Sequence, residues 1–228
     1  MTVRTERQDG LLIITVDRPK VRNATNPETA SALYQAFVDF DQDTGADIAI
    51  LTGAAGVFSA GYDLQAFASD PAAANRARAR WHFGQNDTPP EAPMGPTRLQ
   101  LSKPVIAAIE GPAVAGGLEV AAWCDLRVAS ESAYFGVFCR RFGVPLIDGG
   151  TVRLPRLIGQ SRALDMILTG RRVDSEEALA MGLINRRVPD GQALSAAIEL
   201  ATTIAQFPKA CMRQDRHSAR TQWGLLRR

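Results

Sequence analysis

The sequence predicts an α/β fold that is followed by a helical region. Short apolar runs alternate with segments of helical pattern in the first half of the chain, whereas the second half is mostly helical in pattern. The chain has 228 residues, of which 46% are hydrophobic, so it can bury the core of one α/β domain. We therefore predict a core domain over residues 1–190 and a helical region over residues 191–228.

Two buried strands and a helix between them are the first predicted elements. The runs 11–17 and 47–53 are apolar and rich in β-branched residues, as buried strands are. Asn26 and Pro27 mark the start of a helix that continues to about Phe40, because asparagine caps helices and proline is favoured at the first helical position.

Two connections and a helix follow. The loop 54–64 contains Gly56 and Gly61, which permit tight backbone geometry. An Ala/Arg-rich helix is predicted over residues 71–83. The segment 88–96 has four prolines in nine residues and is predicted to be a loop, of the long kind that tends to border functional sites.

The stretch 103–125, KPVIAAIEGPAVAGGLEVAAWCD, is the most informative part of the chain. Its apolar start predicts a buried strand, a Gly-Pro pair ends that strand, and Gly116 and Gly117 open a helix. Free backbone N–H groups at a helix start carry partial positive charge, and glycine lets an oxygen approach them closely. Glu119 follows within reach of that oxygen, so the stretch predicts a site for a developing oxyanion.

The rest of the chain predicts a strand, a short extended segment and several helices. The strand covers residues 125–130 and the extended segment covers residues 133–137. Asp174 and Glu177 fit a capping box for a helix that ends near Ala180. Further helices are predicted over residues 151–158, 160–169 and 191–207, after which Pro208 breaks the chain.

The charge balance argues against nucleic acid or an anionic membrane as the main partner. There are 26 basic and 24 acidic residues, which gives a net charge of +2. The segment 209–228 is more basic, with six basic residues and Asp215 as its one acid. Such a segment is either a solvated helix face or a surface that attracts a phosphate-bearing ligand.

The cysteine count and the N-terminus predict a cytoplasmic protein. Three cysteines, without metal-type spacing, argue for a reducing compartment and against a disulfide framework. The first ten residues lack the apolar core of a signal peptide, and no run of about 18 apolar residues exists. We expect no membrane association.

Five segments occur in a fixed order: DRPKVRNATN (17–26), FSAGYDL (58–64), KPVIAAIEGPAVAGGLEVAAWCDLRVAS (103–130), GGTVRLPRLIG (149–159) and LTGRRVDSEEALAMGLINRRV (168–188). Together they resemble the signature segments of the crotonase superfamily, also called the enoyl-CoA hydratase/isomerase family. The resemblance implies a ClpP/crotonase fold, with a repeated ββα superhelical core and a C-terminal helical region. It also implies a homotrimer, or a hexamer built from two trimers. In that family the C-terminal helices would still continue at the last residue here, so we expect either a longer natural chain or a different oligomer contact.

The resemblance implies an acyl-CoA thioester as substrate, whose oxygen two backbone N–H groups bind. The matching positions here are Ala60 and Gly116. Fixed donors of this kind favour an enolate-like transition state, and the chemistry needs no metal and no cofactor beyond the coenzyme A of the substrate. Further positions assigned by the resemblance are Gly61, Tyr62, Asp63, Gly117 and Cys139 for substrate binding, and Lys20 and Arg22 for coenzyme A.

Glu119 matches the first of two catalytic glutamates in the family. On its own, a glutamate in the first turn of a helix is more often a residue that complements the helix dipole. The resemblance implies instead a general base that deprotonates the water added to C3 of an enoyl-CoA. The position of the second glutamate is Cys139, whose thiol is a poor substitute for a carboxylic acid at neutral pH.

Asp148 is the candidate for the missing acid, since an aspartate lies at a similar place in the dienoyl-CoA isomerase branch of the family. It could equally be a turn or N-cap residue, because Gly-Gly follows it just before a helix. We predict an enoyl-CoA hydratase-like enzyme, a hydro-lyase. The alternatives are an enoyl- or dienoyl-CoA isomerase that uses Asp148, and a non-catalytic acyl-CoA-binding protein that lost the second glutamate.

Overall fold

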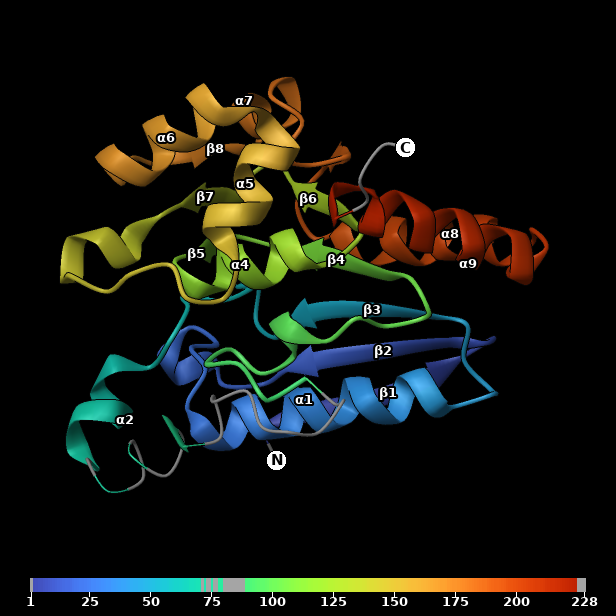
Figure 1. The fold of residues 1–228 in the computed structure, drawn as a ribbon, viewed down its shortest axis with the longest axis horizontal. Coiled ribbons are helices and arrows are strands. Elements are labelled where there is room, and N and C mark those ends of the chain that lie inside the picture. Colours follow the sequence, from blue (N-terminus) through green and yellow to red (C-terminus); the bar gives the residue numbers. More distant parts are fainter. Residues whose placement is uncertain (1, 71, 73–74, 76–77, 80–88, 225–228) are drawn as a thin grey trace.

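A computed structural model describes residues 2–224, apart from 71, 73–74, 76–77 and 80–88. Its larger sheet has six strands in the order β1-β2-β3-β4-β6-β9 (Figure 1). β1 is antiparallel to β2, and the pairs from β2 onward are parallel. The strands are β1 (Val3–Gln8), β2 (Leu11–Val16), β3 (Ile48–Gly53), β4 (Val105–Ile109), β6 (Leu126–Ser130) and β9 (Arg186–Val188).

A smaller sheet and a set of helices complete the fold. The smaller sheet has the order β5-β7-β8, from Pro112–Val114, Tyr134–Gly136 and Val173–Asp174. Helices α5, α6 and α7 group together beside it (Figure 1). The helices are α1 (Pro27–Gln42), α2 (Leu64–Ser69), α4 (Gly116–Trp123), α5 (Gly150–Ile158), α6 (Gln160–Thr169), α7 (Ser175–Ala180), α8 (Ala193–Ala205) and α9 (Lys209–Thr221), with 3-10 turns η1 (Pro19–Val21), η2 (Pro96–Arg98), η3 (Phe138–Phe142) and η4 (Gln222–Gly224).

Helices cover both faces of the larger sheet. The side chains of β2 alternate, so Ile14 belongs to the main core with Phe37 of α1, whereas Ile13 faces the second core. That second core lies under α8, whose Ala197 and Ala201 are fully buried. Small residues spaced four apart let α8 approach the sheet closely. This two-sided burial explains why the central strands are continuously apolar.

Most of the predicted elements are confirmed. The strands at 11–17, 47–53 and 125–130 are present as β2, β3 and β6. Asn26 caps α1 by accepting a hydrogen bond from the N–H of Thr29, as predicted. The side chain of Asp174 caps α7 at the N–H of Glu177. The helix expected at 71–83 lies mostly outside the described residues.

The structure adds elements that the pattern of the sequence did not predict, among them β1, β9 and α9. β1 and β9 are edge strands, and their exposed polar residues hide the alternation of a strand. Pro208 does not end the helical region, because α9 begins directly after it. Basic side chains of α9 bind acids of the core: Lys209 and Arg213 pair with Asp47 at 2.5 and 2.9 Å, and Arg216 and Arg220 pair with Asp125 at 2.9 and 2.6 Å.

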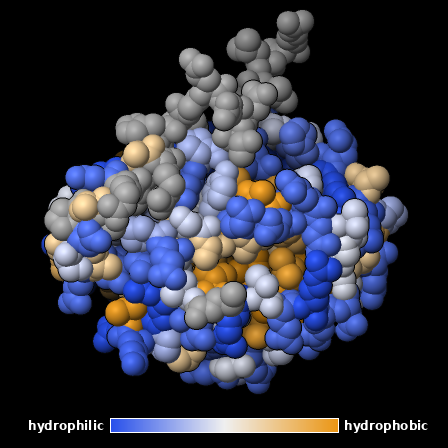
Figure 2. Space-filling model, turned by 90° about the horizontal axis from the view of Figure 1, so that it is seen from below, coloured by the Kyte–Doolittle hydropathy of each residue, from blue (hydrophilic) through white to orange (hydrophobic). Residues whose placement is uncertain are grey.

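The face of the molecule drawn in Figure 2 is mostly hydrophilic. Figure 2 shows one face of the molecule, where apolar residues gather near the centre and hydrophilic residues surround them. Within the described part of the chain, no helix combines the length and the apolar character that crossing a membrane requires.

Candidate active site

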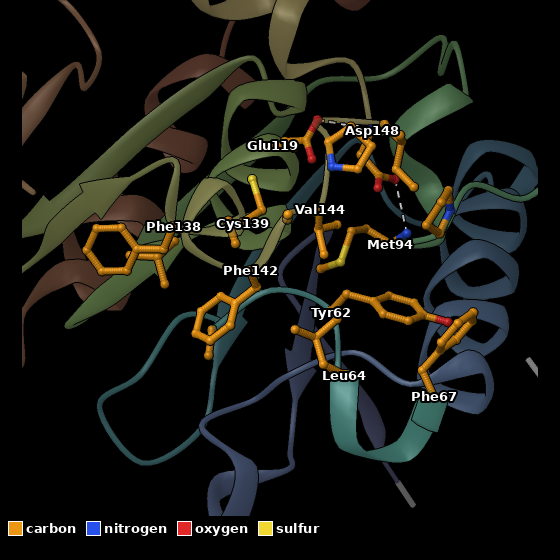
Figure 3. A pocket seen from close by; sticks show the side chains of 18 of the residues that line it. Tyr62, Leu64, Phe67, Met94, Glu119, Phe138, Cys139, Phe142, Val144 and Asp148 are labelled. Carbon is orange, nitrogen blue, oxygen red and sulfur yellow. Dashed lines mark hydrogen bonds between the residues drawn. The ribbon is translucent and has the colours of Figure 1, made fainter. Parts of the chain in front are cut away.

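A cavity of about 670 Å³ opens beside the N-terminal end of α4. Its wall is mostly apolar, and Figure 3 shows Glu119 and Asp148 together at one end of it. Among the described residues that line the cavity, these two are the carboxylates. The predicted site residues found at the wall are Arg22, Ala60, Tyr62, Gly116, Glu119, Cys139 and Asp148.

The N-terminal end of α4 is closely packed and strained. Ala115, the residue before the helix, has a φ of +52°, which is costly for a residue with a side chain. A Cβ on Gly116 would lie 2.6 Å from the sulfur of Met94, and one on Gly117 would lie 2.5 Å from the carbonyl oxygen of Ser59. The backbone contact leaves no room for a side chain at Gly117, whereas a side chain at Gly116 would have to displace the side chain of Met94. The first N–H groups of a helix have no partner inside it, so this end offers donors to the cavity.

Glu119 is buried, with only 2% of its surface exposed. Its Oε1 accepts hydrogen bonds from the N–H groups of Asp148 at 2.9 Å and Gly150 at 2.8 Å. Burial, and then the charge of Asp148, raises the pKa of Glu119 to about 8. Glu119 is therefore mostly protonated at neutral pH in the unliganded protein.

The carboxylate of Asp148 is also buried and is held by a distant segment. Its Oδ1 accepts hydrogen bonds from the N–H of Met94 at 3.0 Å and from the hydroxyl of Thr97 at 2.6 Å. Burial raises the pKa of Asp148 as well. The N-cap residue of α5 is Gly149, so Asp148 does not have the capping role that its sequence also allowed.

Cys139 lies in η3 and lines the cavity, 8% exposed. Burial, and then the charge of Glu119, raises the pKa of its thiol. A raised pKa leaves little thiolate at neutral pH, which argues against a nucleophilic role. The thiol thus adds to the apolar wall.

The structure corrects the expectation for Ala60. Its N–H donates to the carbonyl oxygen of Arg22 at 3.0 Å, so this group is occupied and cannot serve as an oxyanion donor in this conformation. The next N–H, that of Gly61, donates to the hydroxyl of Ser59 at 3.1 Å. The predicted glycine-rich loop is therefore at the cavity, but the N–H groups of Ala60 and Gly61 already have partners.

The other predicted residues lie partly at the cavity wall and partly away from it. Arg22 lines the cavity, whereas Lys20 is exposed and is not part of its wall. Asp63 pairs with Arg18 at 3.0 Å and caps α2, so it fixes the loop. Of the described residues, Gly61, Asp63 and Gly117 are also not at the wall, although the close packing of both glycines shapes it.

Sequence reasoning missed the residues that hold the two carboxylates. Met94 and Thr97 belong to or follow the proline-rich segment, which does border the cavity as predicted. Arg153 donates to the carbonyl oxygens of Asp148 and Thr97. The proline-rich composition pointed to this region, but no pattern indicated which of its groups reach Asp148.

Among the described residues, no cluster of three or more His, Cys, Asp or Glu side chains could hold a metal ion.

Two sheets with flanking helices, and a buried acid in the first turn of a helix that begins with two glycines, define a protein of the crotonase type. The model of the enoyl-CoA hydratase/isomerase family matches residues 6–225, so the chain belongs to that family.

Similar proteins agree with this assignment. The enoyl-CoA hydratase EchA19 of Mycobacterium tuberculosis is 41% identical over 207 residues, which cover 88% of this chain and 73% of that protein. A carnitinyl-CoA dehydratase of Salmonella arizonae is 37% identical over 213 residues, covering 90% of this chain and 75% of that one. A crystal structure of an enoyl-CoA hydratase from Mycobacterium tuberculosis superposes with a TM-score of 0.87 at 36% identity, covering 99% of this chain and 84% of that chain.

Proposed function

We propose that the protein is an enoyl-CoA hydratase-like hydro-lyase, which adds water to or removes it from an acyl-CoA thioester. The observation that carries this proposal is the position of Glu119. It is a buried acid at the wall of a cavity, next to the open N-terminal end of α4. The family membership and the two relatives above, both named for acyl-CoA chemistry of this type, support the same reaction class.

The thioester oxygen would bind between α4 and the loop before α2. Gly116 supplies one N–H, since it is the first residue of α4 and lines the cavity. Tyr62 is the second donor that we propose. The N–H of Thr25 donates to the carbonyl oxygen of Gly61 at 2.7 Å, and the carbonyl oxygen of Thr25 accepts from the N–H of Asp63 at 2.9 Å. The N–H of Tyr62, which lies between these two bonds, therefore points away from Thr25. Removing one such donor costs roughly 3 kcal/mol of transition-state stabilisation in well-studied enzymes.

The two carboxyl groups would move the protons. Hydration forms a C3–O bond and a C2–H bond, so one group must accept the proton of water and another must supply a proton to C2. Glu119 and Asp148 repel each other when both are charged, and the pKa of Glu119 is about 8. This repulsion disfavours the doubly ionised pair, so one group can hold a proton while the other accepts one. This arrangement would compensate for the missing acid at Cys139.

Double-bond isomerisation is the second candidate. It is favoured by the carboxylate of Asp148, which lines the cavity and is held in place by Met94 and Thr97. An acid there could move a proton between two carbons of the acyl chain while the thioester oxygen stays bound.

We also propose where coenzyme A binds, how the protein assembles, where it is located and where its core domain ends. Coenzyme A would lie near Arg22 at the cavity and near Lys20, whose charge is exposed. We propose a homotrimer or hexamer, a cytoplasmic location, and a boundary near residue 190 between the core and the helical region.

Hydration of a chain-length panel of 2-enoyl-CoA thioesters by the purified protein tests the proposal. Glu119→Gln should reduce kcat by at least about a hundredfold, because an amide can neither accept the proton of water nor supply one to C2. Asp148→Asn should also reduce kcat while binding persists. Glu176→Gln, an exposed change in α7, is the matched control and should leave kcat unaltered.

Three outcomes separate the candidates. If the wild type hydrates no enoyl thioester but isomerises a 3-enoyl or dienoyl thioester, the second candidate replaces the first. Binding without any turnover would identify a non-catalytic acyl-CoA-binding protein. Unchanged hydration by Asp148→Asn would remove Asp148 from the reaction.

A further inference from the structure

Arg153 binds the loop of residues 148–150, which carries Asp148 and contacts Glu119. Arg153 itself is not part of the cavity wall. It lies in the first turn of α5, and its Nη1 donates to the carbonyl oxygen of Asp148 at 2.6 Å. Its Nη2 donates to the carbonyl oxygen of Thr97 at 2.5 Å. The guanidinium therefore connects the two segments that bind the catalytic acids.

The placement of this cation is unfavourable by itself. The first turn of a helix carries partial positive charge, so an arginine there is repelled by the dipole. Burial also lowers the pKa of Arg153 to about 10. A bidentate contact with two carbonyl oxygens offsets these costs, because Arg presents a rigid fork of donors.

The intervening loop fits tightly between the guanidinium and Glu119. Gly149 has a φ of +91°, and a Cβ on it would lie 2.2 Å from Nη1 of Arg153. A Cβ on Gly150 would lie 2.9 Å from Oε1 of Glu119. Each glycine thus makes room for one of the two charged groups, and the loop is held from both sides.

The contacts form one connected network. The hydroxyl of Thr97 donates to Oδ1 of Asp148, and the N–H groups of Asp148 and Gly150 donate to Oε1 of Glu119. We propose that Arg153 is a positioning residue, which fixes the loop that orients Glu119 and the threonine that orients Asp148. This inference rests on the proposed function, in which both carboxylates take part.

Removing the guanidinium should change both the rate and its pH dependence. Arg153→Met removes the clamp and the positive charge that lowers the pKa of Glu119 and of Asp148. We expect kcat to fall at least tenfold, KM to change less than threefold, and the pH profile to move to higher pH. Arg153→Lys keeps the charge but cannot bridge two carbonyls, so kcat should fall. Its pH profile should move to higher pH by less than that of the Met variant, because only the loop hydrogen bonds to Glu119 are weakened. The other titratable or charged groups near this network are Arg98, Cys124, Cys139 and Arg220.

The matched control is Arg156→Met, which removes an exposed arginine from the last turn of the same helix and should change neither quantity. Added guanidinium ion should restore part of the kcat of Arg153→Ala if the cavity it leaves accepts the ion. Folding is checked by thermal melts of every variant. Unchanged kcat and pH profile in folded Arg153→Met would overturn the proposal, as would a wild-type kcat in Arg153→Lys.

A titration without turnover separates this inference from the proposed function. Infrared difference spectra of the protonated carboxyl groups report the pKa values of the pair directly. If the wild type hydrates nothing, yet the carboxyl titration moves to higher pH in both Arg153→Met and Arg153→Lys, the hydratase proposal fails and the positioning role stands. If the titration moves in neither variant, or only in Arg153→Met, the positioning role fails whatever the wild type catalyses, because a shift in the Met variant alone reports the lost charge.

Discussion

The two ends of helix α4 are built in opposite ways. At the N-terminal end, two glycines leave backbone donors facing a cavity, and Ala115 adopts a strained conformation. At the C-terminal end, side chains satisfy the last carbonyl groups. Arg127, which is 2% exposed, donates to the carbonyl oxygens of Ala121 at 3.3 Å and Cys124 at 2.7 Å, and Arg220 donates to that of Trp123 at 3.4 Å.

The C-terminal end of α4 anchors the helix, whereas the N-terminal end faces the site of the proposed reaction. Cations near a helix C-terminus interact favourably with the dipole, so they stabilise the helix where no ligand binds. In the proposed reaction, the N-terminal donors bind the thioester oxygen and need no reorganisation when charge develops. The comparison predicts that changes at the N-terminal end reduce activity, and that changes at the C-terminal end reduce stability.

The largest effect is expected from Gly117→Ala. The new Cβ would lie 2.5 Å from a backbone oxygen, that of Ser59, so α4 must move away from the loop before α2. Displacement of the N–H of Gly116 should lower kcat by more than about a hundredfold, because losing one oxyanion donor alone has that effect. Hydration kinetics of the variant measure this loss of kcat. Gly10→Ala is the control: its φ of +78° makes the new side chain strained, but a Cβ there meets no atom within 4 Å, so activity should persist.

A large loss of stability is expected from Arg127→Met at the other end. Its guanidinium also donates to the carbonyl of Leu183 at 2.7 Å, and the variant leaves these buried carbonyl oxygens without donors. We expect the free energy of unfolding in urea to fall by about 4 kcal/mol, with kcat of the folded fraction within about twofold of the wild type. A large loss of kcat at unchanged stability would contradict the separation of roles. Arg186→Met, an exposed change in β9, serves as control.

The third effect is the pH dependence of stability that Glu119 imposes. Its pKa is about 8 in the folded protein and 4.5 in an exposed glutamate, so the folded state binds an extra proton between these values. The free energy of unfolding should therefore decrease as pH rises from about 4.5 to 8, by roughly 3 kcal/mol up to pH 7. Glu119→Gln should lack this decrease. Parallel stability curves for the two proteins would show that burial of Glu119 has no such cost.

The smallest effect is expected from Arg220→Met. This side chain is 35% exposed, and its contacts with Asp125 and Trp123 lie at the surface. Such pairs contribute about 0.2 to 1 kcal/mol, and salt screens them. Urea unfolding at low and high salt should show a loss in that range that shrinks with salt. A loss as large as that for Arg127→Met would mean that α9, and not Arg127, anchors α4.

The sequence predicted the elements whose signals are local. The strand, glycine turn and helix of residues 103–125, and the acid at Glu119, are contiguous, so periodicity and capping rules sufficed. The groups that hold the site come from distant segments. The carbonyl oxygen of Arg22 accepts a hydrogen bond from the N–H of Ala60, and the hydroxyl of Thr97 donates to the carboxylate of Asp148. No local sequence pattern encodes these contacts.

The thioester carbonyl of a bound substrate tests the central claim most directly. Glu119→Gln should bind a 2-enoyl-CoA without turning it over, so the C=O stretching band of the bound thioester can be recorded by isotope-edited infrared spectroscopy. The account predicts a band at lower frequency than in water, because the donors at α4 polarise the bond, and a smaller shift when Gly117→Ala is added. A band at the frequency found in water would contradict an oxyanion site at the N-terminal end of α4.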